Sequence, residues 1–586
     1  MLRSLQYLEM QGEAQRLSFR ALDIEQIGHV YEGLLDHTAK RASEPVLGLA
    51  GAKGKEREIP LARLEELKAK GNGDLIKFLK DETGRSESAL KRALEAEADP
   101  VAGKVRAACG NDEALHSRVI VFSGLLRSDP FGRPVVIHKG SVYVTAGSDR
   151  RSTGTHYTPR SLTEPIVKYT LEPLVYVGPA EGLPENEWKL KSPRDLLDLK
   201  ICDMACGSGA FLVQACRYLS ELLVEAWENA EKQHPDSPGV TPEGAASTGA
   251  AGESLIPMDP NERLTYAKRL IAQRCLYGVD KNPLAVEMAK LSLWLLTLAK
   301  DKPFTFLDHC IRPGDSLVGI RDLDQLKYFN LELDEKRQNI FTGPVMNLVE
   351  EAITLRRKLE ESRSDSVADV DAQRLMLEET QRKTARQRYA ADLLISIEFE
   401  GAKGREKDDL HNLMATKAGH YIGQESAGEL REAAHAALKA QSTFHWPLEF
   451  PEVFVEQGGF DAIVGNPPFM GGTKLETAIG EEFREFIVIN IGNAIRGIRG
   501  TADLCVYFLL RAATLTAEEG GIGILATNTI SQGDSRTVGL EQLFASNWKI
   551  TRATPSQKWP GIASLEIACV WLKKRWSGQF FLNSIR

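Results

Sequence analysis

Short apolar segments alternate with long amphipathic helical patterns from about residue 146 onward, and this alternation constrains the fold more than any other feature. The apolar segments that we expect to be strands span residues 200–203, 275–280, 460–465 and 521–526. Such alternation is typical of an α/β domain with a largely parallel sheet. The sequence therefore predicts an α/β fold.

The length of the chain requires more than one domain. A single hydrophobic core stops growing at about 250–300 residues, whereas the chain has 586. We predict four segments: a mainly helical N-terminal domain (1–145), a first part of the α/β core (146–330), a charged helical insertion (331–445) and a second part of the core (446–586).

Several local patterns refine this division. Helical spacing of apolar residues predicts a helix behind Asp23, and a second helix is expected over residues 86–98. Two short strands are expected around a turn at Lys139 and Gly140. The Pro-, Gly- and Ser-rich residues 234–254 predict a mobile loop, and the insertion reads as a solvated helical hairpin or coiled coil.

Composition excludes several classes of protein. No apolar stretch approaches the roughly 20 residues that span a bilayer, and the first residues lack the apolar core of a secretory signal. Eight scattered cysteines fit a reducing compartment and offer no zinc spacing, so we expect a cytoplasmic protein without a metal. The net charge of −8 disfavours a nonspecific nucleic-acid coat and leaves room for a local basic groove.

Two acidic strand ends and a Gly-rich turn indicate a ligand site. The segment LKICDMACGSGAFL predicts a strand ending at Asp203, a turn, and a helix whose N-terminus presents free N–H groups. Asp280 ends the next predicted strand, where a carboxylate can accept both hydroxyls of a ribose. Asp315 lies in a turn that can face an adenine amino group. A structural turn and a capping carboxylate are the alternatives. Leu212 replaces the third glycine of a dinucleotide fingerprint, which disfavours a nicotinamide oxidoreductase.

The segment FDAIVGNPPFMGG indicates the chemistry. A buried strand stops at Gly465, and two successive prolines then remove two backbone donors from the turn. The Asn466 side-chain oxygen and the Pro467 carbonyl remain as acceptors beside the aromatic ring of Phe469. Two acceptors that hold both hydrogens of an exocyclic amine keep its lone pair on nitrogen and make it a nucleophile. A rigid corner without a chemical role is the alternative.

In this order the motifs resemble those of the S-adenosylmethionine-dependent amino-methyltransferases, and in particular the gamma class of DNA adenine-N6 methylases. In that class a TP-containing segment precedes the Gly-rich loop, and GTHYTPRSLTEPIVKY has that place here. DIEQIGHVYEGLLDH and FHWPLEFPEVF resemble segments of the large type IIG, BREX and DISARM restriction–modification and phage-defence methylases. The resemblance covers about residues 146–575 apart from the insertions, and it implies a Rossmann-like methyltransferase core.

The resemblance also implies roles for individual residues. The residues implied to bind S-adenosyl-L-methionine are Tyr157, Thr158, Pro159, Asp203, Ala205, Gly207, Gly209, Asp280 and Asp315, with Asp503 near the same pocket. The residues implied to form the target-base site are Asn466, Pro467, Pro468 and Phe469, with Trp559 as a second wall. The implied substrate is an adenine flipped out of double-stranded DNA.

The chain departs from the family at both ends. Family members have a target-recognition domain after the core, whereas this chain ends ten residues past Trp576. We therefore expect the recognition module to be missing, truncated or supplied by a separate subunit. The partner protein is expected to be such a subunit or a cognate nuclease. No nuclease pattern precedes Asp23, so we predict no DNA cleavage. The alternatives are the same chemistry on RNA or on a protein glutamine, and a non-catalytic DNA-binding subunit of a defence complex.

Overall fold

The structure is a computed structural model that describes residues 7–10, 13–16, 37–52, 56–95, 102–129, 131–146, 158–250, 253–332, 342–422, 428–438, 441–495, 501–560 and 565–583. Contacts between residues divide the chain into two compact units. The boundary between them along the sequence follows residue 151. Within the described ranges, no helix combines the length and the apolar character needed to cross a membrane.

The first unit combines short strands with short helices around its own apolar core. Its strands are β1 (Tyr7–Met10), β2 (Glu13–Arg16), β3 (His37–Arg41), β4 (Val46–Gly48), β5 (Glu58–Pro60), β6 (Val136–Ile137) and β7 (Val142–Ala146). Its helices are α3 (Leu61–Lys70), α4 (Asn72–Thr83), α5 (Glu87–Glu95), α6 (Ala102–Ala108), α7 (Glu113–Val119) and the 3-10 helix η2 (Ile120–Leu125).

Three local predictions fall in this unit. The helix expected over residues 86–98 is confirmed as α5. The two strands around Lys139 and Gly140 are confirmed as β6 and β7, although β6 pairs with β4 and β7 pairs with β3. The helix expected behind Asp23 lies outside the described residues.

The second unit is built on an eight-stranded sheet. In spatial order its strands are β12 (Ile311–Pro313), β11 (Leu276–Asp280), β10 (Ile201–Asp203), β13 (Phe460–Gly465), β14 (Thr516–Thr527), β16 (Glu566–Lys573), β15 (Lys549–Lys558) and β17 (Phe581–Leu582). Strands β12 to β14 are parallel, and β16 is antiparallel to both of its neighbours. The α/β class and the four predicted strands are confirmed.

The order of the parallel strands fixes where a ligand can bind. From β10 the chain adds β11 and β12 on one side and then returns to add β13 and β14 on the other. In an open α/β sheet such a reversal leaves a crevice beyond the carboxyl ends of the two central strands. The strand order therefore predicts a ligand-binding crevice between the end of β10 and the end of β13.

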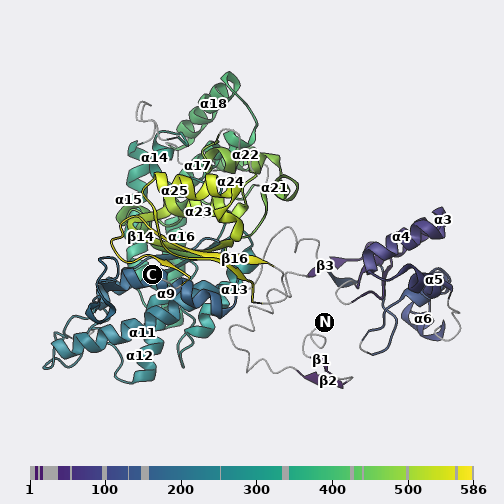
Figure 1. The fold of residues 1–586 in the computed structure, drawn as a ribbon, viewed down its shortest axis with the longest axis horizontal. Coiled ribbons are helices and arrows are strands. Elements are labelled where there is room, and N and C mark those ends of the chain that lie inside the picture. The colour runs from purple at the N-terminus through teal and green to yellow at the C-terminus, as the bar shows by residue number, and fades with distance from the viewer. Residues whose placement is uncertain are drawn as a thin grey trace. The chain divides into compact units, whose positions relative to one another are not determined.

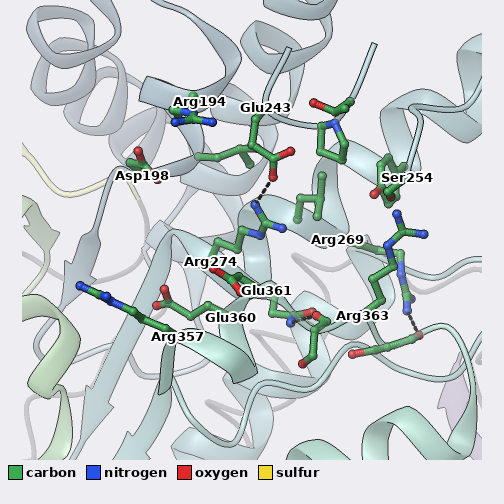
Figure 2. Close-up of a pocket in the computed structure, with 18 of the residues that line it drawn as sticks. Arg194, Asp198, Glu243, Ser254, Arg269, Arg274, Arg357, Glu360, Glu361 and Arg363 are labelled. Carbon is green, nitrogen blue, oxygen red and sulfur yellow. Dashed lines mark hydrogen bonds and ion pairs between the residues drawn. The ribbon is translucent and has the colours of Figure 1, made fainter. Parts of the chain in front are cut away.

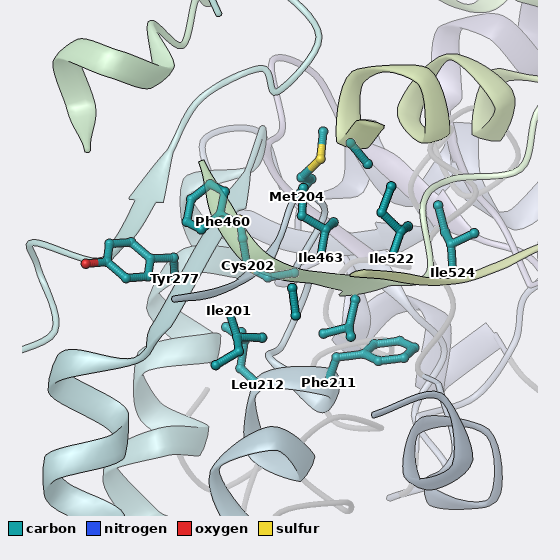
Figure 3. Packing of buried hydrophobic residues seen from close by; sticks show 14 of the residues in the cluster. Ile201, Cys202, Met204, Phe211, Leu212, Tyr277, Phe460, Ile463, Ile522 and Ile524 are labelled. Atoms are coloured by element: carbon teal, nitrogen blue, oxygen red, sulfur yellow. The ribbon is translucent and has the colours of Figure 1, made fainter. Parts of the chain in front are cut away.

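Helices cover both faces of the sheet. Helices α9 (Arg160–Val175) and α11 (Ala210–Gln233) pack on one face, together with α12 (Pro260–Arg274) and α13 (Pro283–Leu296), and α23 (Leu504–Leu515) packs against β14 on the other (Figure 1). Figure 3 shows both sides of this core, with Ile463, Ile522 and Ile524 above the sheet and Ile201, Phe211 and Leu212 below it. Because both faces are covered, the strands read as continuous apolar runs.

The helical insertion is a packed bundle. Its helices are α15 (Thr342–Glu361), α16 (Val367–Lys383), α17 (Ala385–Phe399), α18 (Arg405–Ile422) and α19 (Gly428–Leu438). The expectation of a solvated hairpin or coiled coil is wrong, because α17 is buried around most of its circumference and forms a second apolar core with residues such as Leu393 and Ile397. The charged residues that suggested a solvated hairpin belong mainly to the outer faces of its neighbours.

The described residues of the Pro-, Gly- and Ser-rich segment, 234–250 with 253 and 254, form a loop with no helix or named strand, as predicted. It is nevertheless packed on α11, because Val240 is fully buried and the Trp227 indole N–H donates to the Pro242 carbonyl at 2.7 Å. The small residues of this segment allow a compact path over the helix.

A buried polar network joins the insertion to the amino ends of the strands. Arg356 of α15 pairs with Glu452, and both side chains are 1% exposed. The Tyr277 hydroxyl donates to Glu360 at 2.8 Å, and Lys200 donates to the same carboxylate at 2.9 Å. A cavity of about 670 Å³ adjoins this network, lined by arginines and acids that include the ion pair of Arg274 with Glu243 (Figure 2). It lies at the opposite edge of the sheet from the crevice.

Candidate active site

The predicted site residues converge on the carboxyl edge of the sheet. Asp203 ends β10, Asp280 ends β11, and the NPPF turn directly follows β13. The register pairs Cys202 with both Tyr277 and Ile463, so these three strand ends are neighbours. Thr158 and Pro159 precede α9 in the same unit, whereas Tyr157 lies outside the described residues.

The Gly-rich loop is held by the second acid and is open on its outer side. The Gly207 N–H donates to Asp280 Oδ2 at 2.9 Å. Gly207 and Gly209 adopt φ of +52° and +84°, which side chains rarely tolerate. A Cβ on Gly209 would lie 3.2 Å from Ala289, whereas a Cβ on Gly207 would meet no atom within 4 Å. The backbone at Gly207 is therefore free to lie against a ligand, next to the N-terminus of the 24-residue helix α11.

The acids that end β10 and β11 are both withdrawn from solvent, Asp203 almost completely and Asp280 in part. Asp203 is 1% exposed, and its Oδ1 accepts the Ala205 N–H at 3.1 Å. Burial, with the nearby Asp280 carboxylate, raises the pKa of Asp203 to about 8. Burial likewise raises the pKa of Asp280. Neither acid has a cationic partner among the residues that the structure describes. Two such acids in one site favour a ligand that brings positive charge or several N–H and O–H donors.

Asp315 follows the third parallel strand, β12. Its Oδ1 accepts the Leu317 N–H at 3.1 Å, and its Oδ2 pairs with the exposed Lys281 ammonium at 2.9 Å. The backbone N–H of Gly314 donates to the Asp280 carbonyl at 2.9 Å. The third predicted acid is therefore tied to the second one, on the same edge of the sheet.

The Asn466 amide is anchored at its nitrogen and free at its oxygen. Its Nδ2 donates to the Thr158 hydroxyl at 3.0 Å, a contact between residues 308 positions apart. Its Oδ1 is buried and has no hydrogen-bond partner among the described residues. A buried acceptor without a donor costs about 1–3 kcal/mol. An unpaired oxygen at this point is the expected form of a site that awaits an N–H donor.

Asp503 holds the residue that directly follows the NPPF turn, Met470. Its Oδ1 accepts the Met470 N–H at 3.1 Å, and the Leu504 N–H donates to the Met470 carbonyl at 2.9 Å. The same carboxylate caps α23 by accepting from Cys505. Pro467 is buried, and Pro468 and Phe469 are half-buried.

Trp559 lies at the same edge of the sheet. It directly follows Lys558, the last residue of β15, which is paired with Glu566 at the start of β16. The next residue of β16, Ile567, is paired with Thr527 at the carboxyl end of β14. The side chain is 8% exposed. Its role as a wall for the target base stays a prediction.

Three contacts of this site were not predicted from the sequence. They are the bond of Thr158 to Asn466, the anchoring of Met470 by Asp503, and the ion pair of Lys281 with Asp315. The only local signal was for Asp503, because an Asp immediately before an apolar helical run is a typical N-cap. The other two contacts join segments whose proximity depends on the folded sheet.

Comparisons with known proteins agree on one family. The family described as "Eco57I restriction-modification methylase" matches residues 274–554, and "MmeI, DNA-methyltransferase domain" matches residues 183–310. The solved structure of the type IIL restriction-modification enzyme MmeI in complex with DNA aligns with 94% of this chain and 57% of that chain, at 12% identity and a TM-score of 0.34. That TM-score is too low to establish a shared fold.

Two curated relatives come from a methanogen and a bacterium. The chain is 24% identical over 450 residues to a putative type II restriction enzyme and methyltransferase of Methanocaldococcus jannaschii. The alignment covers 68% of this chain and 34% of the relative. The chain is 27% identical over 143 residues to the type II restriction enzyme and methyltransferase RM.Eco57I of Escherichia coli. That alignment covers 23% of this chain and 12% of that protein. The chain thus spans about a third of the length of the first relative. Its residues 183–310 and 274–554 thus resemble the methylase domains of restriction-modification enzymes of the MmeI and Eco57I type.

Proposed function

We propose that this chain is a DNA methyltransferase with a Rossmann-like core that transfers a methyl group from S-adenosyl-L-methionine to the N6 amino group of a flipped-out adenine. The place of such an enzyme is a restriction–modification or phage-defence system of the cytoplasm. Its substrate is double-stranded DNA, and its partner is a target-recognition subunit or a cognate nuclease.

One observation supports this reaction above all others. Asn466 presents a buried oxygen that has no donor among the described residues, directly before the Pro467 carbonyl. An exocyclic amine offers two N–H donors, one for each oxygen. The two acceptors hold the amino hydrogens and keep the nitrogen lone pair available for attack, so the site needs no strong general base. Phe469, half-buried beside the turn, stacks on the base.

The residues of the crevice fit the proposed cofactor. S-adenosyl-L-methionine, when bound, supplies a methyl group on a sulfonium. Asp203 and the open backbone at Gly207 suit its cationic methionine end, Asp280 suits the ribose hydroxyls, and Asp315 suits the adenine amino group. Each of these carboxylates is an acceptor, and each matching part of the cofactor is a donor or a cation.

Burial of the thiol disfavours another route. A cytosine-C5 methylase uses a cysteine nucleophile, and Cys206 is the cysteine nearest the loop. It is 4% exposed, and burial raises the pKa of its thiol well above the ordinary value. The sulfur also packs against Gly278 of β11, because it would lie 3.2 Å from a Cβ built there. Cys206 is therefore part of the core.

The proposal is tested with cofactor labelled on the methyl group. The full chain is incubated with unmethylated genomic duplex DNA, with RNA and with protein, and the labelled product is hydrolysed and analysed by nucleoside and amino-acid chromatography. We expect N6-methyladenine from DNA. Label on N4 of cytosine, on an RNA base or on glutamine contradicts the proposed substrate, and cofactor binding without any transfer supports the non-catalytic DNA-binding subunit.

A further inference from the structure

The hydroxyl of Thr158 and the amide of Asn466 form the one side-chain hydrogen bond that the described residues show for that amide. Thr158 Oγ1 accepts from Nδ2 at 3.0 Å, and Thr158 is 5% exposed. Thr158 directly precedes Pro159, the N-cap residue of α9, and α9 packs against β13 and β14. The hydroxyl is therefore fixed by a rigid helix start on the same sheet that presents Asn466.

The contact determines which end of the amide faces the crevice. An asparagine amide has a donor end and an acceptor end of nearly equal shape. In this structure the nitrogen is occupied by Thr158, and the oxygen is left buried and unpaired. If the amide turned over, its N–H donors would face an incoming amine that also brings N–H donors. A bond at the nitrogen is therefore needed to keep the acceptor available.

We propose that Thr158 is a positioning residue, whose hydroxyl holds the Asn466 amide by its nitrogen so that the oxygen accepts the substrate amine. This inference rests on the proposed function and deepens it. It differs from the role that the family resemblance implies, in which Thr158 touches the cofactor directly. The two roles predict different kinetic changes.

Three variants separate positioning from packing. Thr158→Val removes the hydroxyl and keeps the shape, whereas Thr158→Ser keeps the hydroxyl. Thr163→Val is the matched control, because Thr163 lies in the first turns of α9 and is 2% exposed. Among the described residues its hydroxyl donates only within that helix, to the Arg160 carbonyl at 3.4 Å. For each variant, kcat, the KM of the cofactor, the KM of DNA and the Tm are measured with the full chain.

Positioning predicts a loss in kcat that the conservative variant restores. We expect Thr158→Val to lower kcat by about 10-fold to 100-fold, the range for a misplaced reacting group, with the cofactor KM changed by less than about twofold. Thr158→Ser returns kcat to within about threefold of the wild type. Thr163→Val keeps the wild-type kcat even if its Tm falls.

Three results overturn the inference. A raised cofactor KM at unchanged kcat in Thr158→Val shows direct cofactor contact. Activity that falls only in proportion to the folded fraction, equally in Thr158→Val and Thr163→Val, shows a packing role. If Thr158→Val keeps the wild-type kcat while Asn466→Ala is inactive, only the positioning role of Thr158 is rejected, and the proposed function stands. If wild-type protein transfers no methyl group, or Asn466→Ala is fully active, the proposed function fails and this inference fails with it.

Discussion

Asp203 Oδ1 lies directly against Gly465, the last residue before the NPPF turn. A Cβ at position 465 would stand 2.7 Å from that oxygen, which is closer than real Cβ contacts. The end of β10 and the end of β13 therefore touch through a carboxylate and a bare backbone. The two halves of the proposed site, for cofactor and for target base, meet at this contact.

We predict that Gly465→Ala displaces Asp203 or the turn. Overpacking of this kind costs about 1–3 kcal/mol of stability, and the displacement lowers kcat. Gly471→Ala is the control, because a Cβ there meets no atom within 4 Å and its φ of −59° suits any residue. Stability is measured by chemical denaturation and kcat by labelled methyl transfer. Equal behaviour of the two variants would contradict the close contact.

The raised pKa of Asp203 predicts a specific dependence of stability on pH. The carboxyl titrates near 3.8 when unfolded and near 8 when folded, so the folded state favours the protonated form. The stability that Asp203 contributes is therefore full below about pH 3.8 and is lost as the pH rises through about 8. Relative to Asp203→Asn, the wild-type Tm should fall between pH 5.5 and 8 and then level off. A Tm difference that is constant over this range would contradict the prediction.

The same titration predicts how a cationic cofactor binds. Binding favours the ionised carboxylate, so wild-type affinity for S-adenosyl-L-methionine should rise with pH, by at most about tenfold for each pH unit below 8. Asp203→Asn should bind more weakly and lack this rise. Isothermal titration calorimetry in buffers of different ionisation enthalpy measures both the affinity and the proton released. Binding of wild type without proton release at pH 7 would count against Asp203 as the cation partner.

The ion pair between the insertion and the core should be essential for stability. Arg356 and Glu452 are both 1% exposed, and the Arg356 guanidinium also donates to the His309 carbonyl at 3.0 Å. Because Arg356→Ala leaves the buried Glu452 carboxylate without its cationic partner, we predict a loss of about 3–5 kcal/mol. The adjacent pair of Arg357 with Glu456 is largely exposed on its arginine side, so Arg357→Ala should leave the Tm unchanged. Comparable thermal shifts for the two variants would contradict this assignment.

The strand ends of the site were predictable because each lies where a buried apolar run stops. Asp203, Asp280 and Asn466 directly follow such runs, and parallel strands bring their carboxyl ends to one edge. Local chemistry therefore indicated both the sheet and the residues on its active edge.

Long-range packing was not predictable from local patterns. Helix α17 is buried because other helices pack around it. The pattern of charged residues along α15 and α16 does not indicate this packing. The bond between Thr158 and Asn466 joins positions 308 residues apart, and neither residue type indicates the other. The packing of the loop on α11, with Val240 buried and Pro242 bonded to Trp227, is likewise a contact that the composition of the loop alone did not indicate.

The central claim is that the Asn466 side-chain oxygen accepts a hydrogen bond from the amine that is methylated. The Asn466→Ala variant tests this claim most directly. Labelled methyl transfer to unmethylated duplex DNA and cofactor affinity are measured together, with Asn229→Ala on the outer part of α11 as a control. We predict that Asn466→Ala lowers transfer by about 100-fold or more while cofactor affinity stays within about twofold, and that Asn229→Ala matches the wild type. Near-normal transfer by Asn466→Ala would contradict the claim.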